Sequence, residues 1–89
     1  MHPDQVAELL RTALPGARVE VRSADQTHFE ALVISEDFAG QRPIARHQRI
    51  YSALGARVGR EIHALSIEAH TPEEWAARRP VNVPAGAPQ

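Results

Sequence analysis

The segment His28-Phe29-Glu30-Ala31-Leu32-Val33-Ile34-Ser35 decides the fold that we expect for this chain. It opens on alternating apolar and polar residues and then becomes apolar on both faces at Leu32-Val33-Ile34. Alternation is typical of a half-buried strand, and a continuous apolar run indicates a strand that is covered on both faces. We therefore predict a strand over residues 28–35.

Two further strands are predicted around this one. Residues 17–23 alternate small or apolar side chains with charged ones, which indicates a half-buried strand. The polar connector 24–27 is short, so this strand and strand 28–35 should pair antiparallel as a hairpin. A third strand, at 62–69, follows a helical segment, and such a crossover favours parallel pairing with a neighbour.

Three helices complete the prediction. The first spans about Pro3 to Leu14 and is stopped by Pro15-Gly16, and the second spans about Pro43 to Leu54. Thr71-Pro72-Glu73-Glu74 opens the last helix, with a threonine cap, a proline at the first position and a capping box closed by the second glutamate; Trp75 should anchor it to the body. The order α-β-β-α-(α)-β-α predicts an α+β fold, with helices stacked on one face of a three-stranded mixed sheet.

The second helix carries both an apolar and a basic pattern. At about 100° per residue its apolar face is expected to hold Ile44, His47, Ile50, Tyr51 and Leu54. Three arginines, Arg42, Arg46 and Arg49, lie near the opposite face and are expected to form a basic stripe. Such a stripe is either a solvated surface or a surface that contacts DNA phosphates or the acidic surface of a partner.

Composition limits the classes of function. The chain has 89 residues and a net charge of -1, which indicates one small domain and argues against strong non-specific nucleic-acid binding. We predict a domain over residues 1–79 and a disordered, proline-rich tail over 80–89. The sequence shows no signal peptide, no membrane span, no nucleophile motif and no phosphate-binding loop, so we expect a cytoplasmic protein that is not an enzyme.

Histidines are the candidate metal ligands, because the chain has five of them and no cysteine. His63 starts the third strand, where it is either a ligand or a partly buried imidazole bonded to a carbonyl. His28 lies where the connector meets the strand, as a loop ligand or a surface residue. His47 falls within the apolar stripe of the second helix, and we interpret it as structural, with a role as an alternative ligand left open.

Five short motifs in a fixed order resemble the BolA family. They are His28-Phe29, Phe38-Ala39-Gly40, Arg46-His47-Gln48, Ile62-His63-Ala64-Leu65 and Thr71-Pro72-Glu73-Glu74-Trp75. The short connector, with histidine in place of cysteine, is most similar to the IbaG-type bacterial branch. The resemblance implies a fold related to the type II KH domain. The Gly-x-x-Gly clamp of KH domains is not evident, because Gly55-Ala56-Arg57-Val58-Gly59 is one residue too long, which argues against KH-type RNA binding.

The resemblance also implies a function. BolA-like proteins partner monothiol glutaredoxins, and such a pair can share a [2Fe-2S] cluster for which the glutaredoxin and glutathione supply thiolates. His63 matches the histidine that the family uses as an iron ligand, and His28 lies in the loop that carries the second ligand. The expected role is iron–sulfur trafficking or iron and stress regulation. The alternative is a DNA-binding transcriptional regulator that uses the second helix and its preceding loop, with weak DNA binding.

Overall fold

The computed structural model describes residues 1–82, with side chains to Arg78. The helices are α1 (Pro3–Ala13), α2 (Pro43–Leu54) and α3 (Pro72–Asn82), and the strands are β1 (Arg18–Arg22), β2 (His28–Ile34) and β3 (Ala64–His70). Two short 3-10 turns, η1 (Glu36–Phe38) and η2 (Gly55–Arg57), flank α2. The predicted element order is confirmed, and the strand ends differ from the prediction by at most two residues.

β2 is the central strand of a three-stranded mixed sheet with the order β1-β2-β3. β1 pairs with it antiparallel, with Arg18 opposite Ile34 and Arg22 opposite Glu30. β3 pairs with it in parallel, because the chain returns through α2 before β3 begins. The hairpin and the parallel crossover are thus both confirmed.

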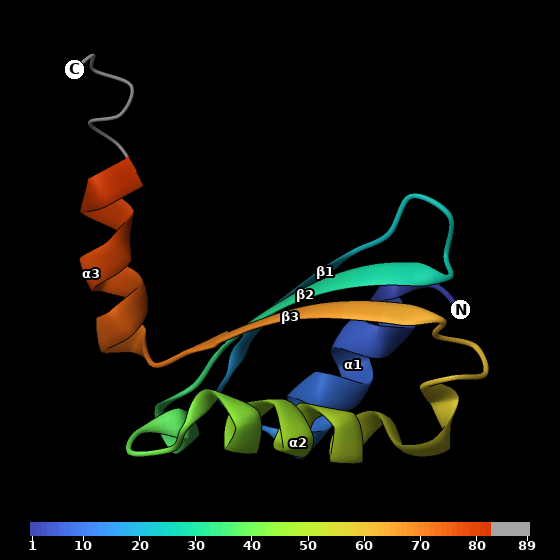
Figure 1. The fold of residues 1–89 in the computed structure, drawn as a ribbon, viewed down its shortest axis with the longest axis horizontal. Helices are drawn as coiled ribbons and strands as arrows, with labels where there is room; N and C mark the ends of the chain where they lie inside the picture. The colour runs from blue at the N-terminus through green and yellow to red at the C-terminus, as the bar shows by residue number, and fades with distance from the viewer. Residues whose placement is uncertain (83–89) are drawn as a thin grey trace.

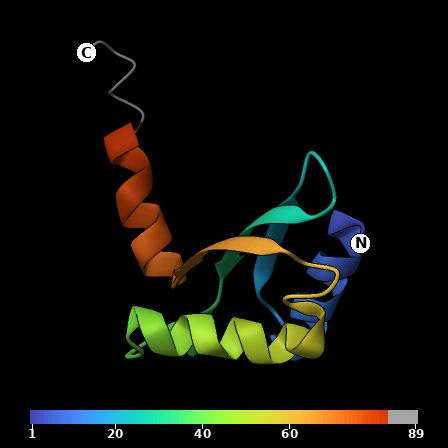
Figure 2. The ribbon, with the colours of Figure 1, turned by 45° about the vertical axis from the view of Figure 1, so that its right-hand side comes forward.

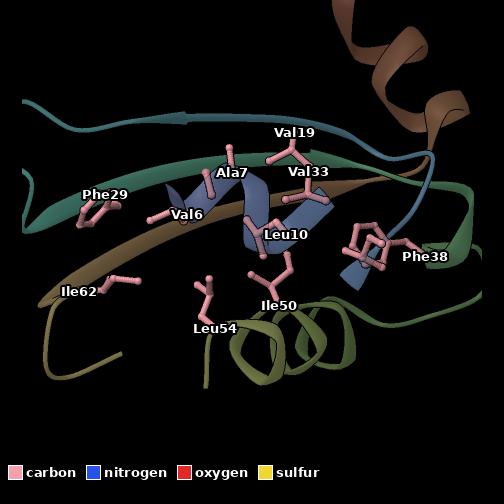
Figure 3. Packing of buried hydrophobic residues seen from close by; sticks show 12 residues of the cluster. Val6, Ala7, Leu10, Val19, Phe29, Val33, Phe38, Ile50, Leu54 and Ile62 are labelled. Carbon is pink, nitrogen blue, oxygen red and sulfur yellow. The ribbon is translucent and has the colours of Figure 1, made fainter. Parts of the chain in front are cut away.

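α1 and α2 cover one face of the sheet and enclose the core (Figure 1). Figure 3 shows Phe29 and Val33 of β2 facing Val6 and Leu10 of α1 and Ile50 of α2. These five side chains are at most 2% exposed. Since Phe29, Ala31 and Val33 share one face of the pleated strand, this single face of β2 carries the centre of the core.

α3 departs from the predicted stacking of all helices on one face. It extends away from α1 and α2, on the other side of the sheet (Figures 1 and 2). The predicted capping box is present, since Glu74 N donates to Thr71 Oγ1 at 3.1 Å and Thr71 N donates to Glu74 Oε1 at 3.0 Å. Trp75 is half-buried, and its ring lies 5.6 Å from the His70 ring, which fixes the start of α3 against β3.

The predicted tail begins at Pro80, whereas α3 continues to Asn82. A helix can carry a proline after its first turn only by giving up a backbone hydrogen bond, so the sequence pattern favours an earlier end. The remainder of the predicted tail, residues 83–89, lies outside the described residues.

The predicted faces of α2 are wrong at three positions. Ile44 is 67% exposed and Tyr51 is 40% exposed, while Arg46 is only 8% exposed. The stripe that faces the core runs through Arg46, Ile50 and Leu54, each four residues after the last. Arg46 therefore lies on the inner face of α2, and the predicted basic stripe of three exposed arginines does not exist.

Arg46 can be buried because each of its polar groups has a partner. Its Nε donates to the Gln41 carbonyl at 2.9 Å and Nη1 donates to the Ala69 carbonyl at 3.0 Å. Two further bonds, of 2.7 and 3.0 Å, reach the two carboxylate oxygens of Glu74. A bidentate pair of this kind is a strong, oriented contact. Together with the bond to the Ala69 carbonyl, this pair links α2 to both β3 and α3.

The same contact controls the ionisation of both partners. Hydrogen bonds from Arg46, followed by that from the Thr71 backbone, lower the pKa of Glu74 from 4.5 to about 2. The hydrogen bonds with Glu74 in turn raise the pKa of Arg46, against the effect of its burial. Both groups are therefore charged at neutral pH.

We expect Arg46→Ala to lower the free energy of unfolding by about 2–3 kcal/mol, because it removes a packed side chain and leaves two carbonyls without a donor. Arg49→Ala is the matched control, since Arg49 makes one exposed ion pair with Asp37 at 3.3 Å. Its removal should cost less than about 1 kcal/mol. Urea denaturation followed by circular dichroism measures both values, and equal losses would contradict the role given to Arg46.

The Glu74 contact should also make stability depend on pH. A carboxyl whose pKa is lower in the folded state stabilises the fold above its unfolded pKa and loses that contribution as pH falls toward the folded value. Glu74→Gln should therefore melt below the wild type at pH 6, and the gap should narrow steadily between pH 4.5 and about 2. Thermal midpoints across this range test the idea; a gap that stays constant with pH would refute it.

Candidate functional site

His28 and His63 lie at the same end of the sheet. The parallel register places His28 opposite Ala64, the residue directly after His63. The backbone N–H of His63 donates to the Thr27 carbonyl at 2.8 Å, and Ala64 N donates to the same oxygen at 3.3 Å. Both histidines are exposed, which excludes the partly buried alternative for His63. Two histidines that are far apart in sequence thus lie at the same end of the sheet, and both are open to solvent.

The connector before β2 is ordered by its own polar side chains. Asp25 Oδ1 accepts hydrogen bonds from the backbone N–H groups of Thr27 at 3.0 Å and His28 at 2.9 Å. Ser23 Oγ donates to the His28 carbonyl at 2.6 Å and accepts from Gln26 N at 2.8 Å. Aspartate and serine side chains stabilise tight turns in this way. The turn therefore holds His28 in a defined position.

Asp25 also contacts the imidazole of His28. Its Oδ2 lies 2.7 Å from His28 Nδ1. The hydrogen bonds from the His28 and Thr27 backbone hold the pKa of Asp25 well below its usual range, so the group is a carboxylate and can only accept. In a neutral His28 ring, this contact favours the tautomer that carries the proton on Nδ1 and leaves the Nε2 lone pair free. Histidines that bind metals commonly have such a carboxylate partner.

Sequence reasoning missed this role of Asp25. A signal was present, because an Asp-x-x-His spacing across a tight connector places the carboxylate near the ring. An aspartate in a turn also has an ordinary structural explanation, and the ring contact depends on the loop geometry.

His47 is not brought to this pair. It is half-buried on α2 and lines a groove together with Ile67, Ala69 and His70, toward the far end of β3. Ile67 lies three residues along β3 from Ala64, or about 10 Å in a parallel strand. The arrangement favours a role for His47 in that groove over one as a ligand beside His28 and His63.

The donor set at the sheet end fits part of an iron site. Two imidazoles replace two thiolates on one iron of some two-iron clusters, so this chemistry is compatible with a [2Fe-2S] cluster. Within residues 1–82, no group of three or more histidine, aspartate or glutamate side chains could hold a metal ion together. Ligands for the remaining positions would have to come from another molecule.

The three arginines are not brought together as one surface. Arg42 is exposed at the start of α2, and Arg49 is exposed but paired with Asp37. Arg46 is committed to the Gln41 and Ala69 carbonyls and to Glu74. Around α2, the basic surface therefore has two exposed arginines of the three that the sequence predicts.

No helix in the described part of the chain is long and apolar enough to span a membrane.

Comparison with known proteins places this geometry in a family. The model of the BolA family, described as BolA-like protein, matches residues 10–74. The chain is 35% identical to the acid stress protein IbaG of Escherichia coli over 92% of its own length and 98% of that protein. It is also 43% identical to a Haemophilus influenzae protein named DNA-binding transcriptional regulator BolA, over 60% of this chain and 52% of that protein.

The fold is shared as well. The structure superimposes on that of a BolA homologue from Coxiella burnetii with a TM-score of 0.76, at 35% identity, over 85% of this chain and 97% of that one. The family match covers most of the chain, and the α+β architecture agrees with the solved structure. On both grounds, this chain is a member of the BolA family.

Proposed function

We propose that this protein is a non-catalytic partner of a monothiol glutaredoxin and shares a [2Fe-2S] cluster with it through His28 and His63. The observation that carries the proposal is the parallel register of β2 and β3, which places two exposed imidazoles at one end of the sheet. Membership in the BolA family supports it.

Each residue at this end has a distinct task. The cluster, when bound, supplies an iron that accepts imidazole nitrogen as a ligand. Asp25 holds the His28 proton on Nδ1, so that Nε2 is the ligand atom. His63 supplies the second imidazole, and its backbone is fixed by the Thr27 carbonyl. The partner and its glutathione would complete the set with thiolates.

Neutral imidazoles suit a protein that holds a cluster for transfer. A thiolate brings a negative charge to iron, and an imidazole does not, so replacing thiolates by imidazoles raises the reduction potential of the cluster. A chain that contributes only neutral ligands also depends on its partner for retention. The cluster is then cargo held between two proteins.

The first test is the visible absorption spectrum of the heterodimer reconstituted with a monothiol glutaredoxin and glutathione. His63→Ala should alter the spectrum and shorten the cluster lifetime, and His28→Ala should do the same. Asp25→Asn should shorten the lifetime by about 10-fold or more, as removal of an outer-shell partner typically does, while the iron ligands remain.

His70→Ala is the matched control, because His70 lies at the other end of β3 and contacts Glu68 and Trp75. It should leave the spectrum and the lifetime unchanged. A His28→Ala, His63→Ala double variant with the lifetime and spectrum of the wild type would remove both ligand assignments.

A second candidate function, DNA binding, is favoured by one observation. The Haemophilus influenzae relative carries the name of a DNA-binding transcriptional regulator. Of the helix-two arginines, Arg42 and Arg49 are exposed and could reach phosphates, whereas Arg46 could do so only by leaving Glu74. With a net charge of -1, we rank this function second.

The DNA function has its own test. If Arg42 and Arg49 each neutralise a phosphate, Arg42→Gln with Arg49→Gln should reduce the salt dependence of duplex binding by about 0.9 for each phosphate that is no longer neutralised. Arg46 is left unchanged because its replacement should destabilise the fold. Fluorescence anisotropy at several salt concentrations measures the slope. Tight, sequence-selective binding that this double variant abolishes, with cluster sharing unaffected, would reverse our ranking.

A further inference from the structure

A cluster of three polar side chains joins α3 to the carboxyl end of β3. Nη1 of Arg78, on α3, lies 3.0 Å from Nε2 of His70 and also donates to Oε1 of Glu68. His70 and Glu68 both belong to β3, and Glu68 Oε1 lies 3.2 Å from the same His70 nitrogen. One ring nitrogen of a half-buried histidine therefore faces a cation from the helix and an anion from its own strand.

Only one of the two contacts at His70 Nε2 can be a hydrogen bond at a time. A guanidinium has donors and no acceptor, so Arg78 bonds to Nε2 only when that nitrogen is unprotonated. Contacts with His70, and then with Arg78, lower the pKa of Glu68, which is therefore a carboxylate and can bond only to a protonated Nε2. The contact with Arg78 is the shorter one, which favours an unprotonated Nε2 in the neutral ring.

Protonation of His70 exchanges one contact for the other. Both ring nitrogens of an imidazolium are donors, so Nε2 can then donate to Glu68 and can no longer accept from Arg78. It would also bring a second positive charge to 3.0 Å from the guanidinium. The bond to Glu68 lies within β3, whereas the bond to Arg78 joins β3 to α3. The exchange therefore removes a link between the helix and the sheet.

The other charged and titratable groups around His70 do not reverse this effect. From three elements, the groups are Glu68 of β3, Arg46 and His47 of α2, and Glu74 and Arg78 of α3. Glu74 attracts an imidazolium, but both of its carboxylate oxygens already accept from Arg46. The charge of Arg46, and any charge on His47, opposes protonation of His70. The register partner of His70 on β2 is Ile34, which carries no charge.

Arg78 extends the attachment of α3 by one helical turn. The first turn is held by the ion pair of Glu74 with Arg46 and by Trp75, whose ring lies beside His70. Arg78 follows Glu74 by four residues, and the helix then extends away from α1 and α2 (Figures 1 and 2). The ion pair of Arg78 with Glu68 is exposed on both sides, and pairs of this kind contribute little. The bond to His70 is thus the part of this attachment that protonation can remove.

We propose that His70 is a pH-sensitive switch that controls how firmly α3 is held on β3. When neutral, it accepts a hydrogen bond from Arg78 and holds the second turn of the helix. When protonated, it releases Arg78 and that turn becomes mobile. Histidine is the side chain that ordinarily changes charge between about pH 5 and 8. Because Arg78 binds the neutral form, the link is present at the upper end of this range and is lost as pH falls.

The first test is the tautomer of His70, measured by long-range ¹H–¹⁵N NMR on the full chain at pH 8 without metal or glutaredoxin. The unprotonated nitrogen should be Nε2 in the wild type. Arg78→Ala should move the proton to Nε2, where it donates to Glu68. Arg49→Ala is the matched control, because Arg49 is paired with Asp37, and it should leave the tautomer unchanged. A wild-type His70 that carries its proton on Nε2 at pH 8 would overturn the proposal.

The second test is the mobility of α3, measured by ¹⁵N relaxation at the amides of Ala76 and Ala77. In the wild type, their order parameters should fall from about 0.85 at pH 8 to below about 0.6 at pH 5. His70→Gln should keep the high values at both pH values, because the glutamine oxygen accepts from Arg78 and does not titrate. Arg78→Ala should give low values at both. His47→Gln, which removes the neighbouring histidine of α2, should retain the wild-type change.

Two results of the second test would contradict the switch. One is a wild type whose α3 order parameters are the same at pH 8 and pH 5. The other is a His70→Gln variant that shows the same fall as the wild type, which would assign the change to another group. Because neither test contains iron or glutaredoxin, a failure here is distinguishable from a failure of the cluster proposal.

Discussion

The parallel pairing of β2 with β3 determines where the two candidate iron ligands of this protein lie. It brings His63 beside His28 at the beginning of the two strands, and it leaves the odd-numbered backbone groups of β3 on the outside of the sheet. The pairing requires the chain to return through α2, and Arg46 holds that return in place by binding β3 and α3 from the inner face of α2. One buried guanidinium at the carboxyl end of β3 therefore helps to hold the crossover that brings the two histidines to the same end of the sheet.

Much of the fold could be predicted from the sequence because its signals are local. The hairpin depends on a short polar connector between two patterned strands, and the bounds of α2 follow from Pro43 and Gly55. The capping box of α3 needs only Thr71 and Glu74, three residues apart. Each of these features is decided within one turn or one short segment of chain.

Arg46 could not be placed in this way. Its burial depends on Glu74, 28 residues later, and on the carbonyls of Gln41 and Ala69, none of which a helical pattern reveals. A polarity pattern assigns arginine to solvent, and it assigns the apolar residues Ile44 and Tyr51 to the opposite, core-facing side of the helix. In the structure the inner stripe of α2 is narrow, since it packs against α1 and one side of a three-stranded sheet. Apolar residues outside that stripe stay exposed.

The candidate site shows the same division between local and distant information. The family resemblance points to His28 and His63 individually, but their position at the same end of the sheet depends on strand register, and the contact of the His28 ring with Asp25 depends on the turn. The position of β3 at the outside of the sheet could not be predicted for the same reason, because a strand pattern does not say which side of the strand is paired.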